Sequence, residues 1–401
     1  MAFDFSALRR FPDVEAPNLQ AWDATDELLV QRALDADVAG DAIAVIGDEY
    51  GAISLALTDA GMQGIRVHQD LITGRRALAA NARALALALP AAHELDSSLL
   101  TGARLVLLQL PKGLAELEEV ADAVARWAAP DVTLIAGGRV KHMALTQNQV
   151  LASYFAHVQP QRAERKSRLI VASGALPVPD QPRFPVSRQH DGFTLSAYGG
   201  AFAGARLDIG TRVLIDVMGT LDPPARSQLR RSEPFQPSEA PIGGNQGEFS
   251  GVVNARPLRV VDLGCGTGAL AVAFAQRHPD AVITATDRSA SAARSAQATV
   301  VANGLAGRIT VTLDDAGSEL PDGSADLVLL NPPFHLGATV HEGAGQRLIQ
   351  AAARLLRPGG EVWTVFNSHL DHRGVLTRDV GPTEQVARTP KFTVTRSIRR
   401  G

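Results

Sequence analysis

Hydrophobic positions in the second half of the chain gather into short runs separated by longer amphipathic stretches. The runs are LRVVDL at 258–263, AVITATDRS at 281–289, RITVTLDD at 308–315, ADLVLL at 325–330 and GEVWTVFN at 360–367. Strands that alternate with helices of about 10–15 residues are typical of a parallel sheet covered on both faces. The pattern therefore predicts a doubly wound α/β domain, whose ligands bind beyond the carboxyl ends of the strands.

The first of these runs continues into a glycine-rich loop. Glycines stand at 264, 266 and 268, and Asp287 ends the next predicted strand. Glycine allows positive φ and lets a ligand approach the backbone, and an acid at this distance can accept hydrogen bonds from ribose hydroxyls. The loop predicts a nucleotide-like cofactor, and by itself it also fits a dinucleotide site.

The fourth run ends in the sequence Asn331-Pro332-Pro333-Phe334-His335. The side-chain oxygen of Asn331 and the carbonyl of Pro332, held in a stiff turn, can accept the two N–H groups of a planar exocyclic amine. They would orient its nitrogen and stabilise the positive charge that grows there during methyl transfer. Phe334 offers a flat face on which a base can stack. A dehydrogenase needs no such turn, so this segment predicts an amine methyltransferase.

Composition limits the other possibilities. Hydrophobic residues are 45% and charged residues 20% of the 401-residue chain, with a formal net charge of −3, as in globular proteins without an overall basic coat. A single cysteine, Cys265, excludes an internal disulfide framework, and we expect no bound metal. No apolar run reaches the roughly 20 residues of a membrane span, and the amino terminus lacks the apolar block of a signal peptide. We therefore expect a cytoplasmic protein that does not bind membranes.

From about Phe202 onward, the chain resembles class I S-adenosylmethionine (SAM) methyltransferases. More narrowly, it resembles the bacterial ribosomal-RNA guanine-N2 methyltransferases of the RsmC and RlmG kind. The resemblance rests on FAGARLDIGTRVLI, VVDLGCGTGALAVAFA, TATDRSASAARSAQATVVANG, ADLVLLNPPFHLG and LLRPGGEVWTVFN, in that order. Two features depart from it: Ala203 follows Phe202 where the family often has serine, and residues 219–257 form a Pro/Ser/Gly/Arg-rich insertion that we expect to be disordered.

The resemblance implies roles for individual residues. Gly264, Gly266 and Gly268 would cradle the methionine part of SAM with Asp262 nearby, and Asp287 would hold the ribose. Asp315 would meet the adenine amine, with Asp314 close enough to compete, and Phe202 would help close the pocket. The catalytic residues would be Asn331, Pro332 and Phe334, and Asn331 would also contact the cofactor. Pro333 and His335 are candidate substrate contacts.

The first half of the chain repeats the sequence pattern of the second half in a degenerate form. With an offset of 217 residues, Gly47 and Gly51 align with Gly264 and Gly268, and Asp70 aligns with Asp287. With an offset of 222, ARLVLLQLPK at 103–112 aligns with ADLVLLNPPF at 325–334. We expect residues 1–190 to be a degenerate methyltransferase-like domain and residues 191–401 the catalytic domain, with the insertion at 219–257.

The chemistry of the first copy is predicted to be lost. Val45 replaces Asp262, Glu49 replaces Gly266, and Gln109 to Lys112 replace Asn-Pro-Pro-Phe. The resembling family also carries such an inactive amino-terminal copy. Cations around Lys141, Arg165 and Lys166 suggest that this half positions RNA through phosphates, although a solvated charged face fits almost as well.

The function predicted from the sequence is SAM-dependent methylation of a guanine N2 in ribosomal RNA of the small (16S) or large (23S) subunit, with that RNA or a ribosomal particle as partner. Methylation of a protein glutamine amide, or of an adenine or cytosine amine, is the alternative within the same chemistry. A nicotinamide-dependent oxidoreductase and a non-catalytic ribosome-assembly factor are alternatives from other classes. Cofactor-binding assays with each nucleotide would separate the oxidoreductase from the methyltransferase.

Overall fold

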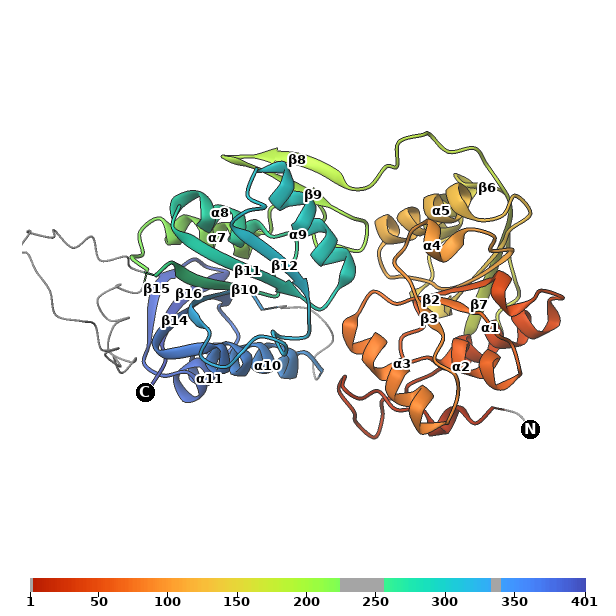
Figure 1. Cartoon of the computed structure of the whole chain (residues 1–401), viewed down its shortest axis with the longest axis horizontal. Helices are drawn as coiled ribbons and strands as arrows, with labels where there is room; N and C mark the ends of the chain where they lie inside the picture. Colours follow the sequence, from red (N-terminus) through yellow and green to blue (C-terminus); the bar gives the residue numbers. More distant parts are fainter. Residues whose placement is uncertain (1–2, 224–255, 333–339) are drawn as a thin grey trace, which may run out of the picture.

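The computed structural model describes residues 3–223, 256–332 and 340–401, which form two α/β units lying side by side (Figure 1). Between the units in sequence lies a hairpin of strands β8 (Val186–His190) and β9 (Phe193–Ala197). Residues 224–255 of the expected insertion lie outside the described part, as do Pro333, Phe334 and His335. No helix among the described residues is long and apolar enough to cross a membrane.

The two units share one sheet topology. The described residues form two seven-stranded sheets, with the orders β3-β2-β1-β4-β5-β7-β6 and β12-β11-β10-β13-β14-β16-β15. In the first sheet the strands are β1 (Ile43–Ile46), β2 (Arg66–His68), β3 (Ala91–Ala92), β4 (Leu105–Gln109), β5 (Thr133–Arg139), β6 (Phe155–Pro160) and β7 (Ser167–Ala175). In the second they are β10 (Leu258–Leu263), β11 (Ala281–Asp287), β12 (Ile309–Leu313), β13 (Ala325–Leu330), β14 (Leu356–Asn367), β15 (Thr383–Arg388) and β16 (Phe392–Ile398).

This topology confirms the predicted tandem doubly wound fold, with one addition. Five strands of each sheet are parallel, whereas the last two to pair, β7 with β6 and β16 with β15, run antiparallel. The strands predicted up to residue 367 are all parallel, and the antiparallel strands at this edge are an addition to the prediction. No helix intervenes between β6 and β7 or between β15 and β16, so these strands can pair only as hairpins.

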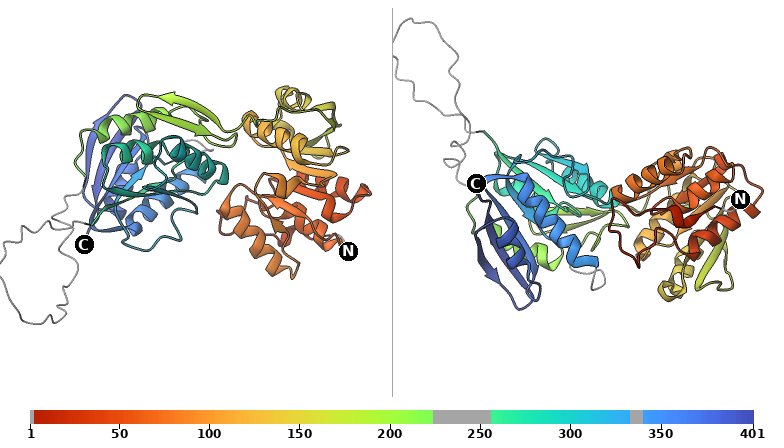
Figure 2. Two further views of the ribbon diagram at one scale, coloured as in Figure 1. Left: turned by 45° about the horizontal axis from the view of Figure 1, so that its top comes forward. Right: turned by 90° about the horizontal axis from the view of Figure 1, so that it is seen from below.

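Helices cover both faces of each sheet, as the two further views show (Figure 2). The first unit has α1 (Ala24–Asp35), α2 (Ala52–Asp59), α3 (Ile72–Ala84), α4 (Ser97–Leu100), α5 (Leu114–Trp127), α6 (Leu145–Ala152) and the 3-10 turns η1 (Phe5–Ala7), η2 (Gly40–Ala42) and η3 (Val140–His142). The second has α7 (Ile209–Met218), α8 (Ala269–Arg277), α9 (Ala290–Ala302), α10 (Val340–Leu355) and α11 (His372–Asp379).

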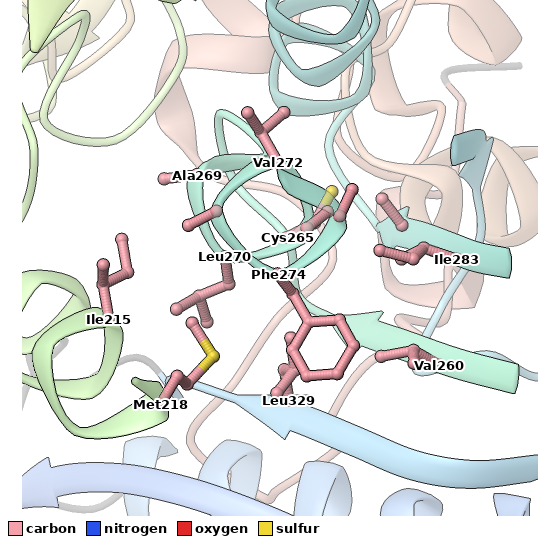
Figure 3. Packing of buried hydrophobic residues seen from close by; sticks show 14 of the residues in the cluster. Ile215, Met218, Val260, Cys265, Ala269, Leu270, Val272, Phe274, Ile283 and Leu329 are labelled. Atoms are coloured by element: carbon pink, nitrogen blue, oxygen red, sulfur yellow. The ribbon is translucent and has the colours of Figure 1, made fainter. Parts of the chain in front are cut away.

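The core under α8 fixes the direction of that helix. Phe274 is fully buried, and its ring meets Trp363 of β14 edge-on, with 6.1 Å between the ring centres. Leu270 from the same helix and Leu329 from β13 fill the space around it (Figure 3). Burying a side chain of this size contributes roughly 1.5–3 kcal/mol, so the helix start and the glycine loop before it are held at the strand ends.

Helix α9 holds the hairpin against the second unit through its polar side chains. Three backbone N–H groups of β9 and the residue after it, those of Thr194, Ser196 and Tyr198, donate to Asn303, Thr299 and Ser295 at 2.9–3.0 Å. The side-chain acceptors recur every four residues, so one helix face satisfies every second N–H of the strand. The hairpin thus packs with the second unit. This packing favours a domain boundary ahead of Val186, and the expected boundary after residue 190 stays a prediction.

The first and last glycines of the two loops have similar backbone conformations. Gly47 and Gly51 have φ of 80° and 89°, and their counterparts Gly264 and Gly268 have 73° and 79°. The first unit, however, has its buried acid at a different position of the loop. Asp48 accepts the N–H of Ser54 at 2.8 Å. In the second unit Asp262 accepts the N–H of Ala271, the counterpart of Ser54, at 2.9 Å. In both cases an acid accepts an N–H group of the first helical turn, which has no partner within the helix.

The two units meet through equivalent turns. Leu71 and Ser289 form an antiparallel bridge, and the N–H of Ile72 donates to the carbonyl of Arg288 at 2.9 Å. Asp70 accepts at two points on α9: its carbonyl takes the N–H of Ala290 at 2.9 Å, and its carboxylate takes the N–H of Ser291 at 2.7 Å. Asp70, which aligns with Asp287, therefore caps a helix of the other unit.

A second contact between the units involves Arg76 of α3. Its guanidinium donates to Asp314 at 3.1 Å, to Ser318 at 3.1 Å and to Glu319 at 2.9 Å. These three acceptors lie on the turn that follows β12, so the first unit holds a turn of the second.

Candidate active site

A cavity of about 540 Å³ opens at the carboxyl ends of the parallel strands in the second sheet. A volume of this size accommodates a small molecule or cofactor. Most of the predicted site residues meet on its wall: Phe202, Gly264, Gly266, Asp287, Asp314, Asp315, Asn331 and Pro332. These residues, predicted from the sequence, therefore come together at one place in the fold.

The glycines of the loop have different surroundings. Gly264 and Gly266 line the cavity with φ of 73° and 54°, and a Cβ added to Gly266 would meet no atom within 4 Å. The bare backbone of Gly266 therefore faces open space, where a ligand could approach it. Gly268 does not line the wall. A Cβ there would come within 3.2 Å of the Ala296 backbone, so this glycine serves the close packing of α8 on α9.

Asp287 connects the glycine loop to the start of α9. One carboxylate oxygen accepts the N–H of Gly266 at 2.9 Å, and the other accepts the N–H of Ser289 at 3.0 Å. Each carboxylate oxygen can accept more than one donor, so the group can still receive ribose hydroxyls. Asp262 lies beneath the loop, away from the wall, and burial raises its pKa to about 7. Its position supports an indirect role, through the N–H of Ala271.

Asp314 and Asp315 have separate surroundings. Asp314 is 2% exposed, and its carboxylate accepts from Ser318, from the N–H of Glu319 and from Arg76. Asp315 pairs with Arg347 of α10 at 2.6 Å, through Oδ2. A carboxylate has a second oxygen with acceptor capacity, which a ligand amine can use. The geometry favours Asp315 for the adenine contact and Asp314 for holding the turn, and both roles stay predictions.

Asn331 presents an unsatisfied acceptor. Its Nδ2 donates to Thr211 Oγ1 at 2.8 Å and to Asp208 Oδ2 at 3.2 Å. Its Oδ1 is buried and has no hydrogen-bond partner among the described residues. Buried polar atoms are nearly always paired, so an orphaned oxygen on a cavity wall points to a missing ligand donor. Thr286 Oγ1 is a second such oxygen on this wall.

The mouth of the cavity combines an aromatic face with positive charge. The side chain of Phe202 is 76% exposed, and Ile209 is 58% exposed. Arg206 and Lys391 are exposed nearby and form no ion pair within the described ranges. An exposed ring beside cations suits stacking on a base and contact with phosphate.

Cys265 also lines the cavity, but burial raises the pKa of its thiol well above the ordinary value. A thiol that stays protonated is a poor nucleophile, so nothing in its setting assigns it covalent chemistry. Across residues 3–223, 256–332 and 340–401, no group of three or more His, Cys, Asp or Glu residues could hold a metal ion.

The corresponding region of the first unit is filled by the chain itself. Tyr50, the counterpart of Thr267 in the cavity wall, is buried, with its hydroxyl bound to Asp13 at 2.9 Å and Arg10 over its ring. Gln109, the counterpart of Asn331, donates its amide to Asp26. Burial raises the pKa of Asp26 to about 8. These contacts support the prediction that this copy binds no cofactor.

The cations suggested for RNA contact lie together on the first unit. Arg165 and Lys166 form the two-residue turn before β7, with φ of 47° and 64°, and the N–H of Val140, beside Lys141, donates to the Lys166 carbonyl at 3.0 Å. Arg165 is paired with Glu27. Lys141 and Lys166 are exposed, and neither forms an ion pair in the described part of the chain. Their role in RNA contact stays a prediction.

Sequence reasoning missed three polar groups of the site: Asp208, Thr211 and Arg347. Asp208 and Thr211 belong to the LDIGT segment, which carried the resemblance but had been given no chemistry. The signal was present in the form of a helix N-cap acid followed by threonine. Their contact with Asn331 crosses 123 and 120 residues, and no local pattern encodes it.

Comparison with known proteins tests the predicted family. Residues 1–175 match the RLMG N-terminal domain family, and residues 251–396 match the methyltransferase small domain family. The ribosomal RNA large subunit methyltransferase G of Streptomyces griseus is 32% identical to this chain, over 98% of it and 97% of the relative. The protein of the same name from Ectopseudomonas mendocina is 32% identical, over 98% of each chain.

Among solved structures, the T. thermophilus 16S rRNA N2 methyltransferase RsmC, in complex with AdoMet and guanosine, superposes with a TM-score of 0.70. It is 19% identical, and the match covers 96% of this chain and 97% of that one, so it supports the tandem fold over the full length. Both halves of the sequence match domain families, and relatives of 32% identity cover nearly the whole chain, so the predicted family is confirmed. The chain belongs to the ribosomal RNA large subunit methyltransferase G family.

Proposed function

We propose that this protein transfers a methyl group from SAM to the exocyclic N2 amine of a guanine in the ribosomal RNA of the large subunit. The observation that carries the proposal is the buried, unpartnered Oδ1 of Asn331 on a cavity wall that also holds a glycine loop and two acids. The relatives that share nearly the whole chain are named for the large subunit, which favours that subunit over the small one.

The residues of the cavity fit the cofactor. Gly264 and Gly266 offer bare backbone for its methionine part, and Asp287 and Asp315 each retain acceptor capacity, for ribose hydroxyls and for an adenine amine. When bound, SAM supplies an electrophilic methyl group on a sulfonium.

Asn331 and Pro332 act on the amine of the target. Its lone pair is delocalised into the ring, so the nitrogen is a weak nucleophile that needs orientation. Asn331 Oδ1 and the carbonyl of Pro332 can accept its two N–H groups and stabilise the charge that develops on nitrogen. The methylated nitrogen is acidic, so its proton can pass to water without a dedicated base.

Access by the RNA requires an unpaired target. The N2 amine of guanine is engaged in pairing within a duplex, so the base must lie in a single-stranded segment or rotate out of the helix. The exposed Phe202 offers a stacking face at the mouth, and Arg206 and Lys391 offer phosphate contacts. Lys141 and Lys166 of the first unit would extend this contact, and that unit would position RNA without binding cofactor.

The test uses large-subunit ribosomal RNA from cells that lack the enzyme, both as naked RNA and as assembled subunits. Incubation with labelled SAM, digestion and mass spectrometry of the nucleosides should reveal N2-methylguanosine. Asn331→Ala should lose transfer but bind SAM within about threefold of wild type, because the cradle and acids remain. Transfer of label to protein glutamine or to adenine, or full turnover by Asn331→Ala, would overturn the proposal.

A further inference from the structure

Asn331 has a carboxamide, and the two ends of a carboxamide are nearly the same shape. Rotation by half a turn exchanges the C=O acceptor for the NH₂ donor. Only the acceptor end can receive an N–H of the substrate amine. Asn331 can therefore serve the proposed function only if something in the protein selects one of the two orientations.

Two residues at the start of α7 make this selection. Asp208 accepts the Asn331 Nδ2–H at 3.2 Å and Thr211 accepts it at 2.8 Å. A carboxylate can only accept hydrogen bonds, so the end that faces Asp208 must be the NH₂ group. The opposite end, Oδ1, is then left buried and unpartnered in the described part of the cavity.

We propose that Asp208 and Thr211 are positioning residues that hold the Asn331 carboxamide with its oxygen toward the substrate amine. The inference rests on the proposed function, since it explains how Asn331 is prepared for that role. It also gives a task to the LDIGT segment, whose helix is tied to the exit of β13 across more than a hundred residues of chain.

The local structure is built around this contact. Asp208 Oδ2 also accepts the N–H of Thr211 at 3.1 Å and so caps α7. A Cβ on Gly210 would come within 3.1 Å of Asp208 Oδ2 and of the Phe392 ring, so the glycine leaves room for both. Thr211 is 9% exposed, which keeps water away from the hydroxyl that meets Asn331.

A related tie occurs in the first unit, where Gln109 donates to Asp26 in the first turn of α1. The link between the helix before the first strand and the exit of the fourth strand is therefore a property of this fold. In the second unit, Asn331 lines the same cavity as the glycine loop, and the far end of its amide has no partner among the described residues. A hydrogen bond between an acid and an amide at this place can also serve the fold alone. The experiment therefore has to separate the capping of α7 by Asp208 from the orientation of the Asn331 amide.

Asp208→Ser and Asp208→Asn make that separation, because serine and asparagine both cap helices well. One oxygen of Asp208, Oδ2, accepts from the Thr211 N–H and from Asn331 Nδ2. Serine can cap through its Oγ but is too short to reach Asn331, whereas the amide oxygen of an asparagine can take the place of Oδ2 and accept from both. We expect kcat of Asp208→Ser to fall by roughly 10-fold and that of Asp208→Asn to fall by less, with the Kd for SAM nearly unchanged. A role limited to capping predicts instead that Asp208→Ser behaves like wild type.

Thr211 supplies a second, independent test. Thr211→Val removes the hydroxyl at similar volume and should lower kcat, and Thr211→Ser, which keeps the hydroxyl, should recover most of that loss. Asp216→Asn, at an exposed acid of the same helix, is the matched control for removing a charge from α7. Thermal unfolding and SAM titration of every variant show that each is folded and loaded.

The measurements use large-subunit RNA from cells that lack the enzyme and separate two kinds of failure. If Asn331→Ala is inactive while Asp208→Ser and Thr211→Val keep wild-type kcat, the positioning role is rejected and the proposed function stands. If Asn331→Ala itself is active, the function is rejected. Asp208→Ser combined with Asn331→Ala should be no slower than Asn331→Ala alone, because both act through one group.

Discussion

Arg76→Ala tests whether the first unit supports the cofactor site of the second. The substitution removes three hydrogen bonds to the turn after β12, which carries Asp315 on the cavity wall. Removing one partner of a buried ion pair costs about 3–5 kcal/mol, and an exposed pair is worth about 0–1 kcal/mol. Arg76 is 32% exposed and Asp314 2%, so this pair lies between those limits.

The carboxylate of Asp314 keeps its bonds to Ser318 and to the N–H of Glu319, which reduces the loss further. We therefore expect roughly 1–2 kcal/mol of destabilisation of the turn. If the cofactor binds only the ordered turn, its Kd rises by about 5- to 30-fold, since each 1.4 kcal/mol is a factor of ten. Arg76→Lys keeps the charge without the planar fork and should fall between wild type and Arg76→Ala.

Isothermal titration with SAM measures the effect directly, and thermal unfolding confirms that the variants are folded. Arg83→Ala removes another arginine of α3, one whose side chain is exposed, and serves as the control. An unchanged Kd for folded Arg76→Ala would refute the reasoning, as would an equal loss of affinity in Arg83→Ala. Either result would mean that the turn is ordered without help from the first unit.

Three further predictions address other parts of the molecule. Gly266→Ala should weaken SAM binding by about tenfold, because alanine is strained at φ of 54° and its Cβ would enter the cavity. Titration with SAM, on variants of equal thermal stability, measures the Kd. An unchanged Kd would contradict a cofactor cradle at Gly266. Asp26 has its pKa raised from 3.8 to about 8 by burial, so the folded state holds a proton that the unfolded state releases, and the free energy of unfolding should fall as pH rises from about 4 to 8. In Asp26→Asn, the free energy of unfolding should differ less between pH 5 and pH 8, as measured by urea titration. The same pH dependence in wild type and variant would contradict a raised pKa at Asp26. Lys141→Glu with Lys166→Glu should weaken RNA binding several-fold and reduce its salt dependence, while leaving SAM binding intact; equal RNA affinity at every salt concentration would exclude the phosphate contact.

The tandem fold and the location of the site could be predicted because both depend on local sequence. Apolar runs, positive-φ glycines and acids at strand ends recur at fixed offsets in the two halves. The replacement of Asp262 by Val45 was read as loss of an acid. The structure shows that Asp48 satisfies the corresponding helix N–H instead, which requires knowing where its side chain turns.

Contacts between distant segments could not be predicted. Asp70 was aligned with Asp287 as a remnant of a ribose site, yet it caps α9 of the other unit, a contact that depends on how the units pack. The partners of Asn331 and the pairing of Asp315 with Arg347 are likewise products of tertiary structure. The antiparallel edge strands were missed because nothing was inferred from the sequence after 367.

The bridge between Leu71 and Ser289 has a consequence for how the two halves could diverge. With the offset of 217, Leu71 corresponds to Arg288 and Ile72 to Ser289, so each half offers the same stretch of main chain to the other, as subunits do across the axis of a symmetric dimer. Peptide groups, rather than particular side chains, make the bridge and the bond from Ile72 to Arg288. Because main-chain bonds survive changes of residue type at these positions, the first half could lose its ligand chemistry, as predicted, and still keep this contact with the second.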